Sequence, residues 1–102
     1  MKIVQNGETL SVSGIDALAA ANSNSFASEL SAALPSAISR IDIDLSQAAF
    51  ADCSGIGALL AVRKRARRRN GNVTIRVLNP TPPMLRIFNL TRMDDVFSIE
   101  QQ

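Results

Sequence analysis

Histidine, tryptophan and tyrosine are absent from the chain, and cysteine occurs once, as Cys53. The lack of histidine removes the commonest general base and the commonest metal ligand. One cysteine can form neither an internal disulfide nor a cysteine-rich zinc site. Four phenylalanines are the only aromatic residues, so a platform for stacking nucleic-acid bases is not expected. We therefore expect no metal and no cofactor, and a core built mainly from Ile, Leu, Val and Ala.

Long hydrophobic runs are also missing. The longest apolar run, residues 55–62, is far shorter than the roughly 20 residues that a membrane span needs. Polar residues from Gln5 to Glu8 interrupt the N-terminus before the apolar segment of a secretory signal could form. These features predict a soluble, cytoplasmic chain.

The chain has the length and the apolar content of one globular domain. Its 102 residues are 46% hydrophobic, without a low-complexity segment, and we expect a single domain over residues 1–102. Alternating apolar residues predict four strands, with a fifth at the N-terminus, and helical spacing predicts three helices. The expected strands are 2–4, 9–14, 41–45, 73–77 and 96–99, and the expected helices are 24–35, 54–71 and 80–90.

The helices carry the clearer signals. Phe26, Leu30 and Leu34 share a face of the first, which Pro35 would end. In the second helix Leu59, Val62 and Ala66 share a face, with Ser54 placed to cap its start and Gly71 to end it. Strands and helices alternate through the C-terminal half. This order predicts an α/β sheet with helices packed on it.

A basic run holds most of the positive charge. The net charge is +2, and six of the eleven cations lie between Arg63 and Arg69. These residues continue a helix that has an apolar face, and cations favour a helix C-terminus, so we interpret them chiefly as a solvated side. An acidic protein partner is the next interpretation. Without a basic surface that also carries aromatics, no specific nucleic-acid binding is expected.

The stretch "DCSGIG", residues 52–57, lies between a strand and the start of the second helix. Unpaired backbone N–H groups at a helix start favour an anion, and Gly55 and Gly57 leave room for a close approach. Nucleophilic catalysis by Cys53 lacks an activating base, and Leu59 stands where a cysteine-phosphatase loop needs arginine. We therefore expect a non-catalytic protein, in which Cys53 is a small residue packed beneath a capped helix.

Residues 41–99 resemble the C-terminal two-thirds of a STAS domain, the domain shared by anti-sigma-factor antagonists and sulfate transporters. The segment "SGIDA" (13–17) resembles the family's Gly-x-Asp turn, "DLS" (44–46) its central strand end, and "LNPTPPMLRIFNLT" (78–91) its closing helix. Spacing between these pieces also fits. The match covers almost the whole chain and implies an α/β fold made of a single STAS domain, with a small mixed sheet of four to five strands flanked by helices.

The resemblance implies a switch at residues 52–57. In the antagonists this stretch reads Asp-Ser-Ser/Thr-Gly-Leu-Gly, and a partner that is both anti-sigma factor and GHKL-type serine kinase phosphorylates the first serine. Here Cys53 occupies that position, and Ser54 is the possible substitute acceptor. The partner-binding residues implied are Asp44, Asp52, Cys53, Ser54, Gly55 and Gly57.

The expected function is a regulatory, non-catalytic module that binds an anti-sigma factor and so controls a sigma factor. One alternative is a STAS accessory subunit on the ATPase of a lipid-trafficking ABC transporter, where phosphorylation at this position is not required. A more distant alternative is a thiol redox sensor, because helix N-termini favour thiolate formation. The negative charge of the adjacent Asp52 disfavours the thiolate and so argues against this alternative.

Overall fold

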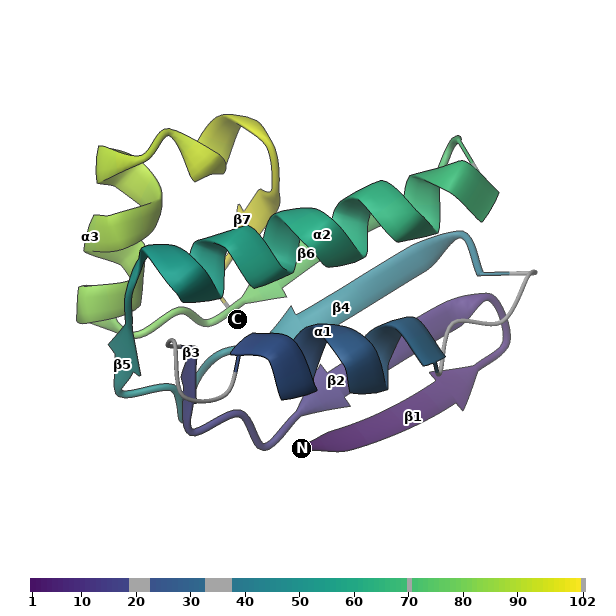
Figure 1. Cartoon of the computed structure of the whole chain (residues 1–102), viewed down its shortest axis with the longest axis horizontal. Coiled ribbons are helices and arrows are strands. Elements are labelled where there is room, and N and C mark those ends of the chain that lie inside the picture. Colours follow the sequence, from purple (N-terminus) through teal and green to yellow (C-terminus); the bar gives the residue numbers. More distant parts are fainter. Residues whose placement is uncertain (19–22, 33–37, 70, 102) are drawn as a thin grey trace.

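The computed structural model describes residues 1–18, 23–32, 38–69 and 71–101. Strands and helices alternate along most of the chain (Figure 1). The strands are β1 (Lys2–Asn6), β2 (Thr9–Ser13), β3 (Ala17–Leu18), β4 (Arg40–Asp44), β5 (Phe50–Ala51), β6 (Thr74–Leu78) and β7 (Ser98–Glu100). The helices are α1 (Ser23–Ala32), α2 (Cys53–Arg69) and α3 (Pro82–Leu90), with the 3-10 turn η1 (Met93–Asp95).

Five strands form one mixed sheet in the order β1-β2-β4-β6-β7. β1 and β2 are antiparallel, and every other pair in this sheet is parallel. The turn between β1 and β2 contains Gly7, whose φ of 64° favours glycine. All five strands that alternation predicted are present, within three residues at either end. The predicted α/β fold with a mixed sheet is confirmed.

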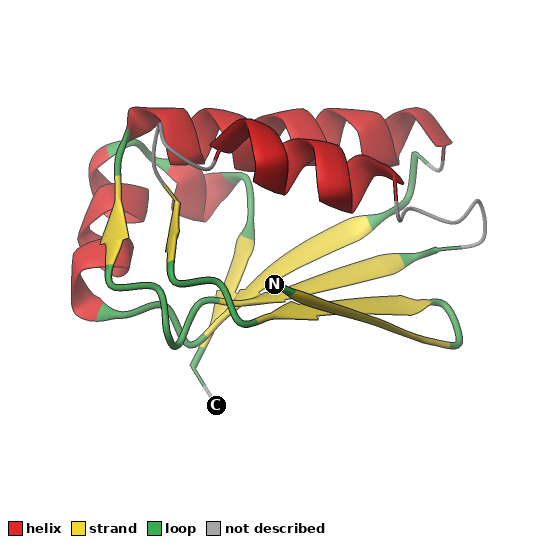
Figure 2. Ribbon diagram, turned by 60° about the horizontal axis from the view of Figure 1, so that its bottom comes forward, coloured by secondary structure: helices red, strands yellow, loops and turns green. Residues whose placement is uncertain are grey.

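Helices α1 and α2 lie side by side on one face of the sheet (Figure 2). The alternating strand residues on that face, such as Ile41, Ile43 and Leu45, are buried, as are Leu59 and Val62 of α2. The apolar face predicted for the second helix is therefore confirmed. For the first helix Phe26 and Leu30 are buried as predicted, whereas Leu34 and Pro35 lie outside the described residues.

The opposite face of the sheet carries a chain of charged side chains. Asp42 is 7% exposed and accepts two hydrogen bonds from Arg76, Nε to Oδ1 at 2.8 Å and Nη2 to Oδ2 at 3.0 Å. Arg40 lies 3.3 Å from the same carboxylate, and Arg76 also pairs with Glu100. The hydrogen bonds that Arg76 donates to Asp42 are the main cause that raises the pKa of Arg76. This face is therefore tied together across β4, β6 and β7 by ion pairs.

A second, two-stranded sheet stands beyond the end of the main one and was not predicted. β3 pairs in parallel with β5, Ala17 opposite Phe50 and Leu18 opposite Ala51. In Figure 2 both strands rise from the level of the sheet toward the helices. The pairing is too short to leave a periodic signal in the sequence. It nevertheless directs the chain from the end of β4 to the start of α2.

No helix among the described residues is both long enough and apolar enough to cross a membrane.

Candidate functional site

Asp52 caps the start of α2. Its Oδ1 accepts hydrogen bonds from the backbone N–H of Ser54 at 2.9 Å and of Gly55 at 3.2 Å. The Asp52 carbonyl accepts the first helical bonds, from the N–H of Gly55 and Ile56. The prediction that Ser54 caps this helix is wrong, because the helix begins at Cys53 and Ser54 already lies within its first turn. The cap is the carboxylate that precedes the helix.

Cys53 and Ser54 both face solvent at this helix start. Cys53 is therefore not a core residue, which disfavours a purely packing role for its side chain. Asp52, which immediately precedes them, places a carboxylate beside both residues. The exposed thiol and hydroxyl are consequently the groups that an approaching partner or modifying enzyme would meet at the start of α2.

The two glycines of this turn lie on different sides of the helix. Gly55 is buried, whereas Gly57 is exposed. A Cβ built on Gly57 would meet nothing within 4 Å, and its backbone has ordinary helical dihedrals. Neither packing nor backbone conformation within the described fold requires glycine at this position, although glycine weakens a helix by about 1 kcal/mol relative to alanine.

Asp44 lies at the end of β4, on the strand that leads toward this site. Its Oδ1 accepts a hydrogen bond from the backbone N–H of Ser46 at 2.9 Å, so the carboxylate stabilises its own turn. Strand alternation places its side chain on the same face as Asp42, away from the helices. The structure thus brings Asp52, Cys53, Ser54 and Gly57 together at the start of α2. Asp44 lies apart from them, at the end of β4.

Residues 45–52 connect β4 to α2, and two contacts that the sequence analysis did not identify hold this segment in place. The hydroxyl of Thr81 donates to the carbonyl of Ala48 at 2.7 Å, and the N–H of Ala49 donates to the carbonyl of Asp16 at 3.0 Å. The first ties the segment to the start of α3 and the second ties it to the turn before β3. The sequence signals for these contacts were Thr81, which precedes two prolines, and the Gly-x-Asp turn that contains Asp16. Neither signal indicates which residue would be contacted.

The start of α2 presents a capping carboxylate and small side chains. Among the described residues, no three acidic, cysteine or histidine side chains gather where they could hold a metal ion. Asp52 uses its carboxylate as a helix cap, and the side chains that follow it are a thiol and a hydroxyl. The arrangement presents small side chains and an exposed glycine around a helix N-terminus, a surface suited to close contact with another molecule.

Known protein structures share this fold. An anti-sigma-factor antagonist (STAS) domain protein from Planctomyces limnophilus has a TM-score of 0.85 at 19% identity, covering 99% of this chain and 88% of that one. The anti-sigma factor antagonist SpoIIAA in its unphosphorylated form has a TM-score of 0.81 at 17% identity, with 99% and 86% covered. The phosphorylated form of the Bacillus cell fate determinant SpoIIAA has a TM-score of 0.74 at 18% identity, with 99% and 89% covered.

At these identities the likeness establishes the fold. No curated protein sequence matches the chain at a significant level. Residues 1–100 match the model of the family described as "Mlab, STAS domain". That match spans nearly the whole chain. The chain belongs to the STAS domain family.

Proposed function

We propose that the chain is a non-catalytic regulatory module that docks a protein partner through the start of α2, in the manner of an anti-sigma-factor antagonist. The partner would be an anti-sigma factor that is also a GHKL-type serine kinase, and docking would free a sigma factor. The observation that carries the proposal is the exposed helix start, where Cys53 and Ser54 face solvent beside the cap formed by Asp52.

Gly57 supports docking at this surface. It is exposed, it has open space around its Cα, and its folded conformation suits any residue. A glycine that the domain does not need for its own packing fits a surface on which another backbone must approach closely. We therefore include Gly57 with Asp52, Cys53, Ser54 and Gly55 in the proposed interface, and place Asp44 at its edge.

Charge at this position would act as the switch. A phosphate adds about two negative charges, and here it would stand next to the carboxylate of Asp52. A charge desolvated without a partner at such an interface weakens binding by about 2–5 kcal/mol. Cys53 has no hydroxyl to accept phosphate, so in this chain either Ser54 is the acceptor or docking is not controlled by phosphate.

The second candidate is an accessory subunit on the ATPase of a lipid-trafficking ABC transporter. Cys53 is the observation that favours it, since a constitutive subunit needs no phosphate acceptor at the helix start. Both candidates use the same docking surface. They differ in the partner and in whether Ser54 is ever modified.

Capture of partners by three forms of the full chain tests the proposal. Tagged wild type, Cys53→Ser and Cys53→Glu are used as baits in lysate of the native cell, and bound proteins are quantified by mass spectrometry. Cys53→Ser should retain the wild-type partner, because a hydroxyl replaces a thiol of similar size on an exposed position. Cys53→Glu should lose that partner while its circular dichroism spectrum stays unchanged.

Thr74→Glu is the matched control, because Thr74 is exposed and begins β6, whereas the docking site lies beyond the other ends of the parallel strands. It should bind as the wild type does. Equal capture by Cys53→Glu and wild type would show that the start of α2 is not the interface. Unfolding of Cys53→Glu would instead assign Cys53 a packing role.

The identity of the captured ATPase then separates the two candidates. A GHKL-type kinase supports the antagonist function, and a transporter ATPase supports the accessory subunit. Incubation with a captured kinase and ATP, followed by phosphopeptide mapping, should place any phosphate on Ser54. A stable phosphate on Cys53 would contradict the proposed role of that residue, and rapid alkylation of its thiol near neutral pH would favour the redox alternative.

A further inference from the structure

A groove of about 420 Å³ lies between the C-terminal parts of α1 and α2. One wall is formed by α1 and the other by α2. The lining residues are Ala27, Ser28, Ser31 and Ala32 of α1, and Ala61, Arg65 and Arg69 of α2. None of them belongs to the site at the start of α2.

Small side chains create this groove. The α1 wall consists of two alanines and two serines at helical spacing, and α2 contributes Ala61 opposite them. Two helices that pack closely usually fill the space between them with larger side chains. Here the groove is lined by alanine methyl groups and, along the α1 wall, by serine hydroxyl groups. Because these side chains are short, an extended peptide backbone can lie close to both helices.

Guanidinium groups form the other wall. Arg65 and Arg69 lie one helical turn apart, and Arg68 joins them around an adjoining hollow of about 170 Å³ that also includes Ser31. The ion pairs found among the described residues involve Arg40 and Arg76 on the sheet, not Arg65 or Arg68. Glu29, the one acidic residue of α1, lines a different hollow, together with Phe26.

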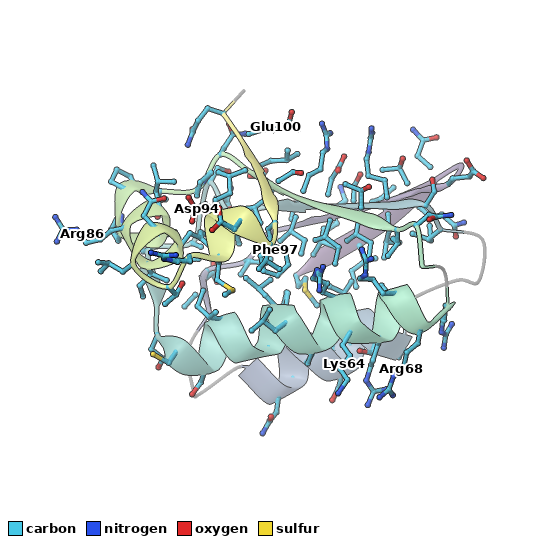
Figure 3. All side chains as sticks on the ribbon, turned by 90° about the horizontal axis from the view of Figure 1, so that it is seen from above. Lys64, Arg68, Arg86, Asp94, Phe97 and Glu100 are labelled. Atoms are coloured by element: carbon cyan, nitrogen blue, oxygen red, sulfur yellow. The ribbon has the colours of Figure 1, made fainter. Side chains whose placement is uncertain are left out.

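The groove is separate from the proposed docking site. Arg65 follows Cys53 by twelve residues on the same helix, which at about 1.5 Å per residue places them roughly 18 Å apart along the axis. Figure 3 shows Arg68 and Lys64 projecting from α2 on the side away from the sheet. A partner segment could therefore occupy the groove without covering the helix start.

We propose that this basic groove binds an acidic segment of a protein partner, with its carboxylates on Arg65 and Arg68 and its backbone over the alanine lining. Arginine pairs well with carboxylates because its planar group can donate two hydrogen bonds to one of them. The inference goes beyond the function proposed above, since it assigns a second contact surface and can be tested without the partner of the first.

Other anionic occupants fit less well. A membrane-binding surface needs bulky apolar residues beside its cations, and the large exposed hydrophobic residues Met1, Val4, Leu60 and Leu90 are not among the residues that line the groove. Single-stranded nucleic acid is held by aromatic stacking, and the groove contains no aromatic residue. The small, open, cationic lining is best matched by a peptide.

Fluorescence anisotropy with a labelled peptide of about fifteen residues, in which glutamate alternates with alanine, tests the proposal. A peptide with glutamine in place of glutamate is the neutral control. At physiological ionic strength Arg65→Glu should weaken binding of the acidic peptide by about tenfold or more, because it replaces a pairing cation with a repelling charge. Arg68→Glu serves as the second variant should Arg65→Glu fail to fold.

Lys64→Glu is the matched control, since Lys64 carries the same charge on the same helix and does not line the groove. It should weaken binding clearly less than Arg65→Glu does, because Lys64 lies one helical turn from Arg68 but does not itself line the groove. Ala61→Leu tests shape without changing charge. Ala61 is exposed and helical, so leucine should be tolerated in the fold and should block the groove.

Equal losses in Lys64→Glu and Arg65→Glu would overturn the proposal, because binding would then follow the general charge of α2. Unchanged binding by Ala61→Leu would overturn the groove as the contact. A third contrary result would be binding to vesicles containing phosphatidylglycerol, with the same dependence on Arg65, in the absence of binding to the peptide. Amide chemical-shift changes confined to Ser28, Ser31, Ala61 and Arg65 on titration with the peptide would support it.

Discussion

Replacing Asp52 with alanine should destabilise the domain by removing the cap of α2. The carboxylate accepts two backbone hydrogen bonds, at 2.9 Å from the N–H of Ser54 and at 3.2 Å from the N–H of Gly55, which also donates to the Asp52 carbonyl at 3.1 Å. Loss of such a cap costs about 1 kcal/mol, within a range of about 0.5–2 kcal/mol. For a domain of this size that corresponds to a fall of about 4–8 °C in the melting temperature.

Urea denaturation followed by circular dichroism measures the effect, with Asp52→Asn and Ser54→Ala as companions. Asparagine keeps an acceptor oxygen, so Asp52→Asn should lose only the contribution of charge at the helix start, about 0.3–1 kcal/mol. Ser54 is exposed and does not provide the cap, so Ser54→Ala should change the unfolding free energy by less than about 0.5 kcal/mol.

The comparison between Asp52→Ala and Ser54→Ala is decisive. A larger loss from Ser54→Ala than from Asp52→Ala would refute the assignment of the cap and restore the expectation drawn from the sequence. A change in the denaturant slope of Asp52→Ala would indicate altered compactness, and the two free energies could then not be compared directly.

Other perturbations test further parts of the structure. Gly57→Ala should raise the unfolding free energy by about 1 kcal/mol in urea denaturation, because the added methyl group meets open space; a loss of stability would contradict the geometry. Leu59→Ala should lower it by about 2–5 kcal/mol, since Leu59 is fully buried, and a loss below 1 kcal/mol would argue against its place in the core. Asp42→Ala should lower the melting temperature in calorimetry more than Glu100→Gln does, because Asp42 is buried and accepts two hydrogen bonds from a guanidinium; the reverse order would be inconsistent with the network. The basic run 63–69 should show only weak, salt-sensitive binding to DNA and RNA, and sequence-selective submicromolar binding at physiological salt would overturn this expectation.

The position of residues 52–57 at a helix start could be predicted from the sequence, but the geometry of that helix start could not. The motif "DCSGIG" fixed which residues stand at a helix start, and the structure places Cys53, Ser54 and Gly57 there. Which residue caps the helix depends on where the helix begins. If the helix began two residues later, Ser54 and not Asp52 would precede it. Asp44 was grouped with the site by resemblance, yet alternation along β4 turns its side chain to the other face of the sheet.

Local periodicity determined most of the secondary structure. Alternation at Ile41, Ile43 and Leu45, and helical spacing at Leu59 and Val62, each report which side of a segment is apolar, and burial follows from that side. Such patterns need no knowledge of distant residues. They were sufficient to predict the strands and the helices packed on them, whereas the mixed sheet and the family followed from the resemblance of the motifs to the STAS domain.

Only the tertiary structure decided which distant segments meet. The pairing of β3 with β5 joins residues more than thirty positions apart through two residues on each side, too few to produce a pattern. The groove likewise arises where small residues on α1 face Ala61 and arginines on α2. In the sequence, the residues of either helix alone have the pattern of an ordinary solvent-exposed helix face. Contacts of this kind depend on how two elements are oriented against the same sheet, which is information that no single segment of the sequence carries.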